Sequence, residues 1–529
     1  MTSATLIPRL RSDLAAAHFS IPGLTGLWGI EADAALQRNQ RVPARRALAT
    51  LATRRSRNEP AATLARLFLL GEPVSRVDLD AALPALGTTG AEQLALVAAD
   101  GESGVRPLVD LRPYGFIDAH GAGSWWIVSD LGELALGHPL GETHVLGIGG
   151  ASRTLSGLVI PTPVARALDI GTGCGIQAMH ASRHAEHVVA TDISVRALKL
   201  AALNAELNEI DNIEFRLGSL FEPVVGERFD HIISNPPFVI TPRGAEVPSY
   251  EYRDGGMVGD ALVEAVVRGA ADHLTPNGVV QLLGNWEYHD ETDAFERLER
   301  WLTPAPDARE AFAPAASTSP ALDAWIIERE VQSPGEYAET WIRDGGTRLG
   351  PEFDRLYNAW LNDFEARGVR RVGFGYLLLR LPPELTPAPT LRRLERMPDA
   401  LGHNPAGLGA HLSECLAAHD WQAGTDDVHL LRTQLTVAPD VTEERHYWPG
   451  QQDPTVMTLH QGSGFGRSVP LDTALAGLVG ACDGDLAVGA IIGALAQLLD
   501  VDEAALTAEL VPRVRELLVD GFLTLPETA

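Results

Sequence analysis

Short apolar segments alternate with helical segments between Arg166 and about Leu381, and this alternation constrains the fold more than any other feature of the chain. Alternation of this kind is typical of a largely parallel sheet covered by helices on both faces. Ligands of such sheets lie at the carboxyl ends of the strands. We therefore expect an α/β core with strands at ARALDIG, HVVATD, NIEFRLGS, FDHIISNPPF, GVVQLLGNW, AWIIEREV and RRVGFGYLLLRL.

The length of 529 residues exceeds what one hydrophobic core usually organises, so several domains are expected. Residues 1–150 are expected to form a mainly helical, winged-helix-like domain with a small sheet. The α/β core is expected at 151–385, where the Pro-rich stretch LPPELTPAPTL marks a boundary. An accessory domain is expected at 386–529, winged-helix-like at its end.

The formal net charge of -28 disfavours tight, nonspecific binding of nucleic acid, because phosphate contacts need clustered positive charge. One N-terminal segment nevertheless has a basic character. It is interpreted as a solvated helical face, and contact with an anionic partner such as RNA or DNA is the alternative. The basic residues of this segment are Arg38, Arg41, Arg45, Arg46, Arg54, Arg55 and Arg57.

Compartment signals in the sequence favour a cytoplasmic protein. The N-terminus lacks the pattern of a secretory signal, and the longest apolar stretch, from Leu486 to Leu499, is too short to span a bilayer. The three cysteines, Cys174, Cys415 and Cys482, form no zinc-binding or disulfide pattern. We expect neither a membrane partner nor a metal site, and the sequence leaves the oligomeric state open.

A glycine-rich loop follows the first strand of the α/β core, in ARALDIGTGCGIQAM. Glycines let the backbone approach a ligand closely, and the N-terminus of the next helix offers free amide donors to an anionic group. The second strand ends at Asp192, whose carboxylate can accept hydrogen bonds from both hydroxyls of a ribose. The alternative role for Asp192 is a helix cap, which Ser194 can provide equally well. The pattern predicts a nucleotide-type site.

The fourth strand runs directly into Asn235, Pro236, Pro237 and Phe238. Consecutive prolines fix the backbone in an extended, rigid turn. The Asn235 side-chain carbonyl and the Pro236 backbone carbonyl can each accept one hydrogen of an NH2 group, and Phe238 can stack on the planar group that carries it. A conjugated amino nitrogen is a poor nucleophile, so its orientation matters more than a strong base.

These motifs resemble the class I S-adenosylmethionine-dependent methyltransferases over roughly residues 150 to 385. DIGTGCG looks like their first motif, and ATD looks like the acidic end of their second strand. The stretch from ALKLAALNAELN to NPPFV is similar to the small-domain, HemK-like supergroup, which includes release-factor glutamine methyltransferases and several RNA adenine and guanine methyltransferases. The resemblance implies a Rossmann-like core with a mostly parallel seven-stranded sheet and S-adenosyl-L-methionine as the cofactor.

The resemblance also implies roles for individual residues. The glycine loop would lie against the methionine part of the cofactor, Asp192 would bind its ribose, and Asp169 would organise the loop and the cofactor's amino group. Ser219 stands where relatives often have an aspartate near the adenine. Asn235 and Pro236 would hold the target nitrogen. The implied cofactor residues are Asp169, Gly171, Thr172, Gly173, Gly175, Asp192, Ile193, Ser219, Leu220 and Asn235, and the implied catalytic residues are Asn235, Pro236, Pro237 and Phe238.

Two further segments are candidates for the border of the site. YEYRDGGMVGD, with Tyr252, Arg253, Asp254, Gly255 and Gly256, could close over the acceptor. GIGGASRTL, with Arg153 and Thr154, could cover the methionine end of the cofactor. For both segments, a plain connecting loop is the alternative.

The leading hypothesis is methylation of a glutamine side-chain amide in a protein, which makes a protein the favoured partner. The nearest alternative is methylation of an adenine amino group in RNA or DNA, presented outside a base stack. Both acceptors are planar and carry NH2, so the motif does not choose between them. A small-molecule acceptor and a nucleic-acid-binding regulator with an inactive core are the remaining alternatives.

Overall fold

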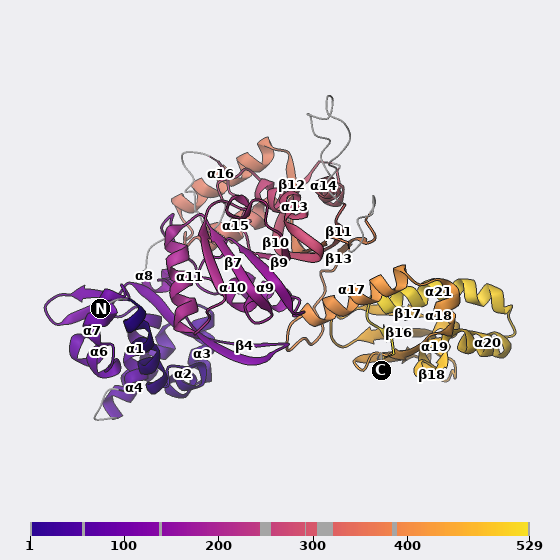
Figure 1. The fold of residues 1–529 in the computed structure, drawn as a ribbon, viewed down its shortest axis with the longest axis horizontal. Coiled ribbons are helices and arrows are strands. Elements are labelled where there is room, and N and C mark those ends of the chain that lie inside the picture. The colour runs from indigo at the N-terminus through magenta and orange to yellow at the C-terminus, as the bar shows by residue number, and fades with distance from the viewer. Residues whose placement is uncertain are drawn as a thin grey trace. The chain divides into compact units, whose positions relative to one another are not determined.

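The computed structural model describes residues 3–54, 59–136, 140–243, 255–290, 292–303, 321–382 and 389–526. The chain divides into two compact units (Figure 1). Unit 1 comprises Met1–Ile117, Ala122–Ser156 and Pro163–Glu395, and unit 2 comprises Asp118–Gly121, Gly157–Thr162 and Arg396–Ala529. The three-domain division expected from the sequence stays a prediction.

Unit 1 contains an eight-stranded sheet in the order β13-β11-β12-β10-β9-β6-β7-β8, which confirms the expected Rossmann-like α/β class. Neighbours from β10 to β8 are parallel, whereas β12 runs antiparallel to both β10 and β11. Seven strands were expected, and β13 is the addition beside β11, where Trp325 Nε1 donates to Glu395 Oε1 at 2.6 Å. The strands are β6 Val164–Ile170, β7 Ala185–Asp192, β8 Ile213–Leu217, β9 Phe229–Ser234, β10 Leu274–His289, β11 Asp323–Gln332, β12 Val369–Arg380 and β13 Arg392–Arg396.

Helices between these strands begin where the sequence supplies caps. The Ser194 hydroxyl accepts from the Ala197 amide at the start of α11, and Ser333 and Glu336 form a capping box at the start of α15. Three helices differ from the sequence-based expectation: α9 replaces an expected loop, and α15 and α16 occupy a stretch for which no element was expected. The helices are α9 Gly150–Leu158, α10 Ile176–Ala181, α11 Val195–Leu207, η2 Glu222–Val224, α13 Ala261–His273, α14 Ala294–Leu302, α15 Pro334–Asp344 and α16 Pro351–Ala366.

The N-terminal part of unit 1 is a helical module with small sheets, in the orders β1-β3-β2 and β4-β5. Its hydrophobic core includes Phe68 and Leu111 and continues onto Met179 of α10 and Leu200 of α11. Its elements are α1 Ser3–Ala16, α2 Ile21–Trp28, α3 Ile30–Gln37, α4 Val42–Arg54, α5 Pro60–Leu64, η1 Ala65–Leu69, β1 Val74–Ser75, α6 Arg76–Ala82, α7 Gly87–Gln93, β2 Val97–Asp100, β3 Gly104–Pro107, β4 Val109–Asp118, β5 Gly121–Asp130 and α8 Glu133–Leu136.

Hydrogen bonds also join this module to the α/β core. On α11, the buried Asn204 side chain receives the Val128 amide at 2.7 Å and donates to the Val128 carbonyl at 2.9 Å. Asn208, one turn further, receives the Trp126 amide at 2.9 Å and donates to its carbonyl at 2.8 Å. The two asparagines therefore bind β5 along one edge, as a neighbouring strand would.

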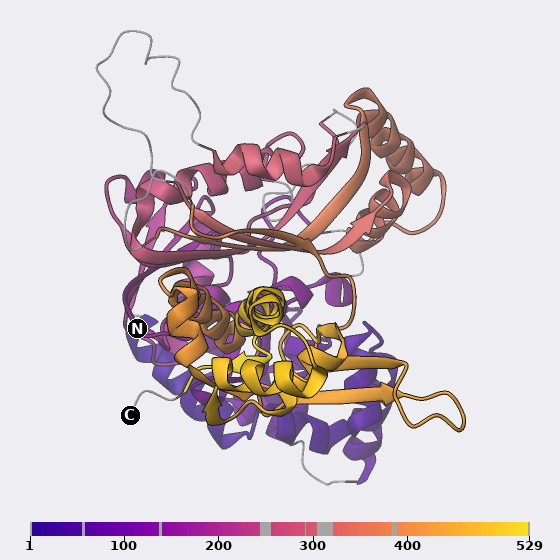
Figure 2. The ribbon, with the colours of Figure 1, turned by 90° about the vertical axis from the view of Figure 1, so that its right-hand side faces the viewer.

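Unit 2 has its own hydrophobic core, and Figure 2 shows its long hairpin β15–β16 extending past the helices. The apolar stretch near Leu498 forms α20, which buries one face and leaves Leu498 80% exposed. No helix among the described residues is long and apolar enough to cross a bilayer. Whether either terminal module is a winged helix stays a prediction. The elements are α17 Gly409–Ala423, α18 Asp427–Arg432, β14 Gln434–Val437, β15 Val441–His446, β16 Val456–Gln461, β17 Ser468–Leu471, α19 Thr473–Gly480, β18 Asp483–Ala487, α20 Val488–Leu499, α21 Glu503–Val519 and β19 Leu523–Thr524.

Replacing Asn204 tests how strongly the N-terminal module depends on the core. Asn204→Leu keeps the side-chain volume but leaves three backbone groups without their partner, namely the Val128 amide, the Val128 carbonyl and the Cys174 carbonyl, so we predict a loss of about 2 to 4 kcal/mol in the free energy of unfolding of unit 1. The change in this free energy is measured by urea unfolding, with limited proteolysis as the probe of the folded fraction. Asn358→Leu, at an exposed position of α16, is the matched control and should change that free energy by less than about 0.5 kcal/mol. Equal effects of the two substitutions would contradict the prediction.

Candidate active site

The carboxyl ends of β6 and β9 bring the two sequence motifs together. Ser234, the last residue of β9, pairs with Ile170, the last residue of β6, and its hydroxyl donates to the Ile170 carbonyl at 2.9 Å. The glycine loop begins at the next residue of one strand and Asn235 begins at the next residue of the other. The predicted cofactor loop and acceptor motif therefore start side by side.

The glycine loop has a backbone that requires glycine. Gly171, Gly173 and Gly175 have φ values of 74°, 55° and 90°, in the left-handed region that other residues rarely adopt. A Cβ at Gly175 would lie 3.0 Å from the Cβ of Ala201, so glycine at this position lets the loop pack closely against α11. A Cβ at Gly171 or Gly173 would meet no heavy atom within 4 Å, so these two glycines border open space.

Asp169 fastens the loop from beneath. Its side chain is almost fully buried, and Oδ2 accepts from the Thr172 hydroxyl at 2.6 Å and from the Ala178 amide at 2.9 Å. Its other oxygen, Oδ1, is buried and has no hydrogen-bond partner among the described residues. Burial raises the pKa of the carboxyl to about 7. A buried oxygen without a donor is a candidate for ligand binding.

Asp192 ends β7 and lies across the loop from Asp169. Oδ2 accepts from the Gly173 amide at 2.9 Å, and Oδ1 accepts from the Ser194 amide at 2.8 Å. Burial raises the pKa of this carboxyl as well. Because Ser194 caps α11, Asp192 is not needed as the cap. Each carboxylate oxygen keeps capacity for another donor, and the role of Asp192 in ribose binding stays a prediction.

Three further predicted cofactor positions, Ile193, Ser219 and Leu220, lie next to Asp192 in the chain or next to its hydrogen-bond partner Gly218. The apolar side chain of Ile193 is 51% exposed, which is suitable for contact with a planar ring. Ser219 and Leu220 follow β8, and the Gly218 amide beside them donates to the Asp192 carbonyl at 3.0 Å. These positions border one end of the loop, but no contact among the described residues assigns Ser219 a ligand.

The acceptor motif follows β9 as expected. Asn235 Oδ1 is buried and has no hydrogen-bond partner among the described residues, and Pro236 is buried beside it. The Phe238 ring contacts two aromatic rings, Trp341 at 6.4 Å and Phe374 at 5.6 Å between centroids. Among the described residues the motif therefore has one oxygen without a partner and one ring held by aromatic contacts, and its role in binding an acceptor NH2 group stays a prediction.

The segment after the acceptor motif is anchored at its base. Tyr252, Arg253 and Asp254 lie outside the described residues. Gly255 has a φ of 55°, and a Cβ there would lie 3.1 Å from Pro237, so the chain returns to the acceptor motif at this residue. Gly256 follows with a φ of 76°.

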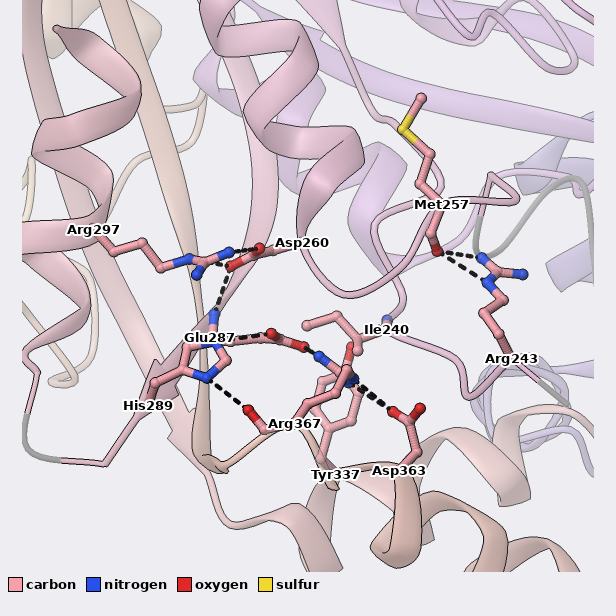
Figure 3. A network of polar contacts seen from close by, with 10 residues as sticks. All are labelled: Ile240, Arg243, Met257, Asp260, Glu287, His289, Arg297, Tyr337, Asp363 and Arg367. Carbon is pink, nitrogen blue, oxygen red and sulfur yellow. Dashed lines mark hydrogen bonds and ion pairs between the residues drawn. The ribbon is translucent and has the colours of Figure 1, made fainter. Parts of the chain in front are cut away.

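Figure 3 shows the polar contacts that hold this base. Arg243 Nε donates to the Met257 carbonyl at 3.0 Å and closes the segment. Asp260, at the start of α13, accepts from the Arg297 guanidinium and from the Glu287 amide at 2.9 Å. Glu287 in turn pairs with Arg367. Burial and the neighbouring Asp260 carboxylate raise the pKa of Glu287.

The segment with Arg153 and Thr154 is helix α9. Ser152 at its start accepts from Gln177 Nε2 at 2.8 Å, which places α9 against the first turn of α10. Gln177 Oε1 is buried without a partner among the described residues. Arg153 is exposed and Thr154 is half-buried. A role for either residue in covering the cofactor stays a prediction.

Sequence reasoning missed three residues that support the site. Asn204 Nδ2 donates to the Cys174 carbonyl inside the glycine loop at 2.8 Å. Tyr337 and Trp341 come from α15 and reach the acceptor segment. A buried polar residue in the apolar run ALKLAALNAEL is a signal for Asn204, whereas nothing local in the sequence marks Tyr337 or Trp341.

Comparison with protein families agrees with this arrangement. Residues 150–301 match the methyltransferase small domain, which contains the glycine loop and the acceptor motif. Residues 16–108 match a domain of unknown function (DUF7059), and residues 413–525 match a second one (DUF7782). The middle of the chain thus matches the methyltransferase small domain, and the segments on either side match families described as domains of unknown function.

Relatives with names align with the middle of the chain. The ribosomal protein uL3 glutamine methyltransferase of Bradyrhizobium diazoefficiens is 35% identical over 191 residues, 34% of this chain and 59% of the relative. The release factor glutamine methyltransferase of Xylella fastidiosa is 37% identical over 131 residues, 23% of this chain and 47% of the relative. A putative protein N5-glutamine methyltransferase of Methanocaldococcus jannaschii is 38% identical over 119 residues, 22% of this chain and 59% of the relative. The chain thus spans about half the length of these relatives.

Solved structures resemble the chain less closely. The YcgJ protein from Bacillus subtilis aligns with a TM-score of 0.25 at 18% identity, over 44% of this chain and 96% of that one. A ribosomal protein L11 methylase from Lactobacillus delbrueckii aligns with a TM-score of 0.22 at 23% identity, over 33% of this chain and 76% of that one.

The buried Asp169 carboxyl predicts a pH dependence of stability in the ligand-free protein. The folded state keeps this carboxyl protonated up to about pH 7, whereas the unfolded chain ionises it near its ordinary value, so the free energy of unfolding falls as the pH rises between the two values. Asp169→Asn removes this dependence. Relative to the wild type, the variant should therefore gain about 2 kcal/mol between about pH 5 and about pH 8 in urea unfolding.

Asp211→Asn, at an exposed position, controls for the removal of one carboxylate and should follow the wild type across this pH range. Parallel pH profiles for the wild type and Asp169→Asn would contradict the prediction.

Proposed function

We propose that this chain, whose residues 150–301 form a methyltransferase small domain, transfers a methyl group from S-adenosyl-L-methionine to the side-chain amide of a protein glutamine. The single observation that carries the proposal is the buried Asn235 Oδ1 beside the glycine loop, which has no hydrogen-bond partner in the described parts of the chain. The match of the middle of the chain to proteins named as glutamine methyltransferases supports it.

The residues around the glycine loop fit this cofactor. Asp169 Oδ1 has no donor within the described ranges, the cofactor's ammonium group would supply one, and the resulting ion pair would keep the carboxylate charged. Asp192 has capacity left for the two ribose hydroxyls. Gly171 and Gly173 border open space, so the chain can lie directly against the ligand.

Acceptor chemistry follows from the orientation of one nitrogen. The cofactor, when bound, supplies an electrophilic methyl group on a sulfonium. Asn235 Oδ1 and the Pro236 carbonyl each accept one hydrogen of the amide NH2, and Phe238 stacks on the amide plane, so that the nitrogen lone pair points at the methyl carbon. The amide nitrogen would gain positive charge as it accepts the methyl group that the bound cofactor would supply, and S-adenosylhomocysteine would be the leaving group. The two hydrogen bonds then strengthen and favour the transition state, and one proton leaves to water.

The charge distribution favours a protein acceptor over nucleic acid. The chain has a net charge of -28, and within the basic N-terminal segment Arg45 is paired with Glu72 at 2.5 Å. Arg66 also contacts Glu72, at 3.2 Å. Arg55 and Arg57 lie outside the described residues. Part of the positive charge of this segment is therefore neutralised within the module and is not available to phosphates.

Methyl transfer itself tests the proposed function. Purified protein with methyl-labelled S-adenosylmethionine should label a protein band in a lysate of the same organism, and nuclease treatment should leave that label in place. Asn235→Ala should slow labelling by about a hundredfold or more, because one hydrogen bond that strengthens in the transition state is lost. The lysate is assayed with and without its ribosomes, since the acceptor can be a ribosomal protein. Label that nuclease releases would instead indicate adenine methylation.

Cofactor binding can be separated from transfer by a second substitution. Asp192→Ala removes the acceptor for both ribose hydroxyls, so we predict that the affinity for S-adenosylhomocysteine falls by about a hundredfold. Isothermal titration calorimetry measures this. Ser194→Ala removes the cap of α11 without touching the ribose position and should keep the affinity. An unchanged affinity of Asp192→Ala would exclude Asp192 from the cofactor site.

A further inference from the structure

The helical hairpin α15–α16 is inserted between β11 and β12. Strand β11 is antiparallel to β12, which is antiparallel to β10, so β11 points the same way as β10 and β9. The hairpin therefore leaves the sheet at the edge where β6, β7 and β9 end. This is the edge that carries the glycine loop and the acceptor motif.

Tyr337 of α15 holds the backbone of the acceptor segment (Figure 3). Its hydroxyl accepts from the Ile240 amide at 3.0 Å and from Asn285 Nδ2. Its ring packs against Trp360 and Phe364 of α16, with centroids 5.9 Å and 6.0 Å away. The hydroxyl is thus fixed by the hairpin and fixes, in turn, a residue two positions after Phe238.

Trp341 lies four residues further along α15, on the same face of the helix. Its ring meets the Phe238 ring nearly at a right angle, 78°, with centroids 6.4 Å apart. Phe374 of β12 contacts Phe238 at 5.6 Å and 49°. An edge-to-face contact of this kind restricts the rotation of the Phe238 ring.

We propose that one face of α15 positions the acceptor motif, with Tyr337 fixing its backbone and Trp341 orienting the ring of Phe238. This inference rests on the proposed function. The amide nitrogen must point at a methyl carbon with little freedom, and a displacement of about 1 Å costs about a hundredfold in rate. Tyr337 and Trp341 are positioning residues, because they act through Ile240 and Phe238 and not on the acceptor itself.

Tyr337→Phe in the full-length chain tests the proposal, since it removes one hydroxyl and keeps the packed ring. The Ile240 amide should exchange its hydrogen about fivefold faster, because one hydrogen bond is lost. Hydrogen–deuterium exchange mass spectrometry of peptides covering 235–243 measures this rate. The turnover number for methyl transfer to the labelled lysate protein should fall by about tenfold to a hundredfold. The affinity for S-adenosylhomocysteine and the KM for S-adenosylmethionine should stay within about twofold of the wild type.

The matched control is Tyr357→Phe on α16, whose ring stacks on Phe353. It should leave both exchange and turnover unchanged. Trp341→Phe should keep more turnover than Trp341→Leu, because only the aromatic ring preserves an edge-to-face contact.

If Tyr337→Phe behaves like Tyr357→Phe in exchange or in turnover, the proposal is overturned. A fall in cofactor affinity equal to the fall in turnover would overturn it too, because the substitution would then disturb the whole domain. Failure of the proposed function would give a different result, because the wild-type protein would then label no protein fraction.

Discussion

The hydrogen bonds accepted by the buried Asp169 side chain are the interactions on which the candidate site depends. One of its oxygens binds both the Thr172 hydroxyl and the Ala178 amide, and this joins the glycine loop to the helix that follows it. The other oxygen, Oδ1, is buried without a partner among the described residues. Burial raises the pKa of the Asp169 carboxyl to about 7. A buried oxygen without a donor is unfavourable in the ligand-free protein, and a bound cation that donates to it would remove this cost. The carboxyl group that shapes the loop therefore also favours a cationic ligand.

The supports of the site come from three distant parts of the chain. Asn204 connects the loop carbonyl of Cys174 to strand β5 of the N-terminal module, whose core continues onto α10 and α11. Tyr337 brings α15 to the acceptor segment from the opposite end of the sheet order. Strand β5 precedes the matched residues 150–301 and helix α15 follows them, so elements outside the matched range support the site from both sides. We infer that Asn204 helps to set the geometry of the glycine loop and that α15 sets the geometry of the acceptor segment, while the two motifs set the chemistry.

The strands and both motifs could be predicted from the sequence because their signals are local. The loop after Ile170, the acidic end of β7 at Asp192 and the Asn235 motif each lie within a few residues of an apolar strand, where period and turn residues are decisive. Val128 lies 76 positions from Asn204 and Ile240 lies 97 positions from Tyr337, and no short sequence pattern specifies these pairings. Helix α9 was missed for a related reason, because its two glycines and two serines resemble a loop until Gln177 packs on it.

The most direct test of the account is to identify the methylated residue. Proteins labelled by the purified chain and S-adenosylmethionine can be digested completely with proteases, and the labelled amino acid can be compared with synthetic N5-methylglutamine by chromatography and mass spectrometry. We predict that the label coelutes with N5-methylglutamine when the wild-type chain is used and is nearly absent with Asn235→Ala. Label in another amino acid, in a nucleoside or in a small molecule, at equal yield with Asn235→Ala, would contradict it.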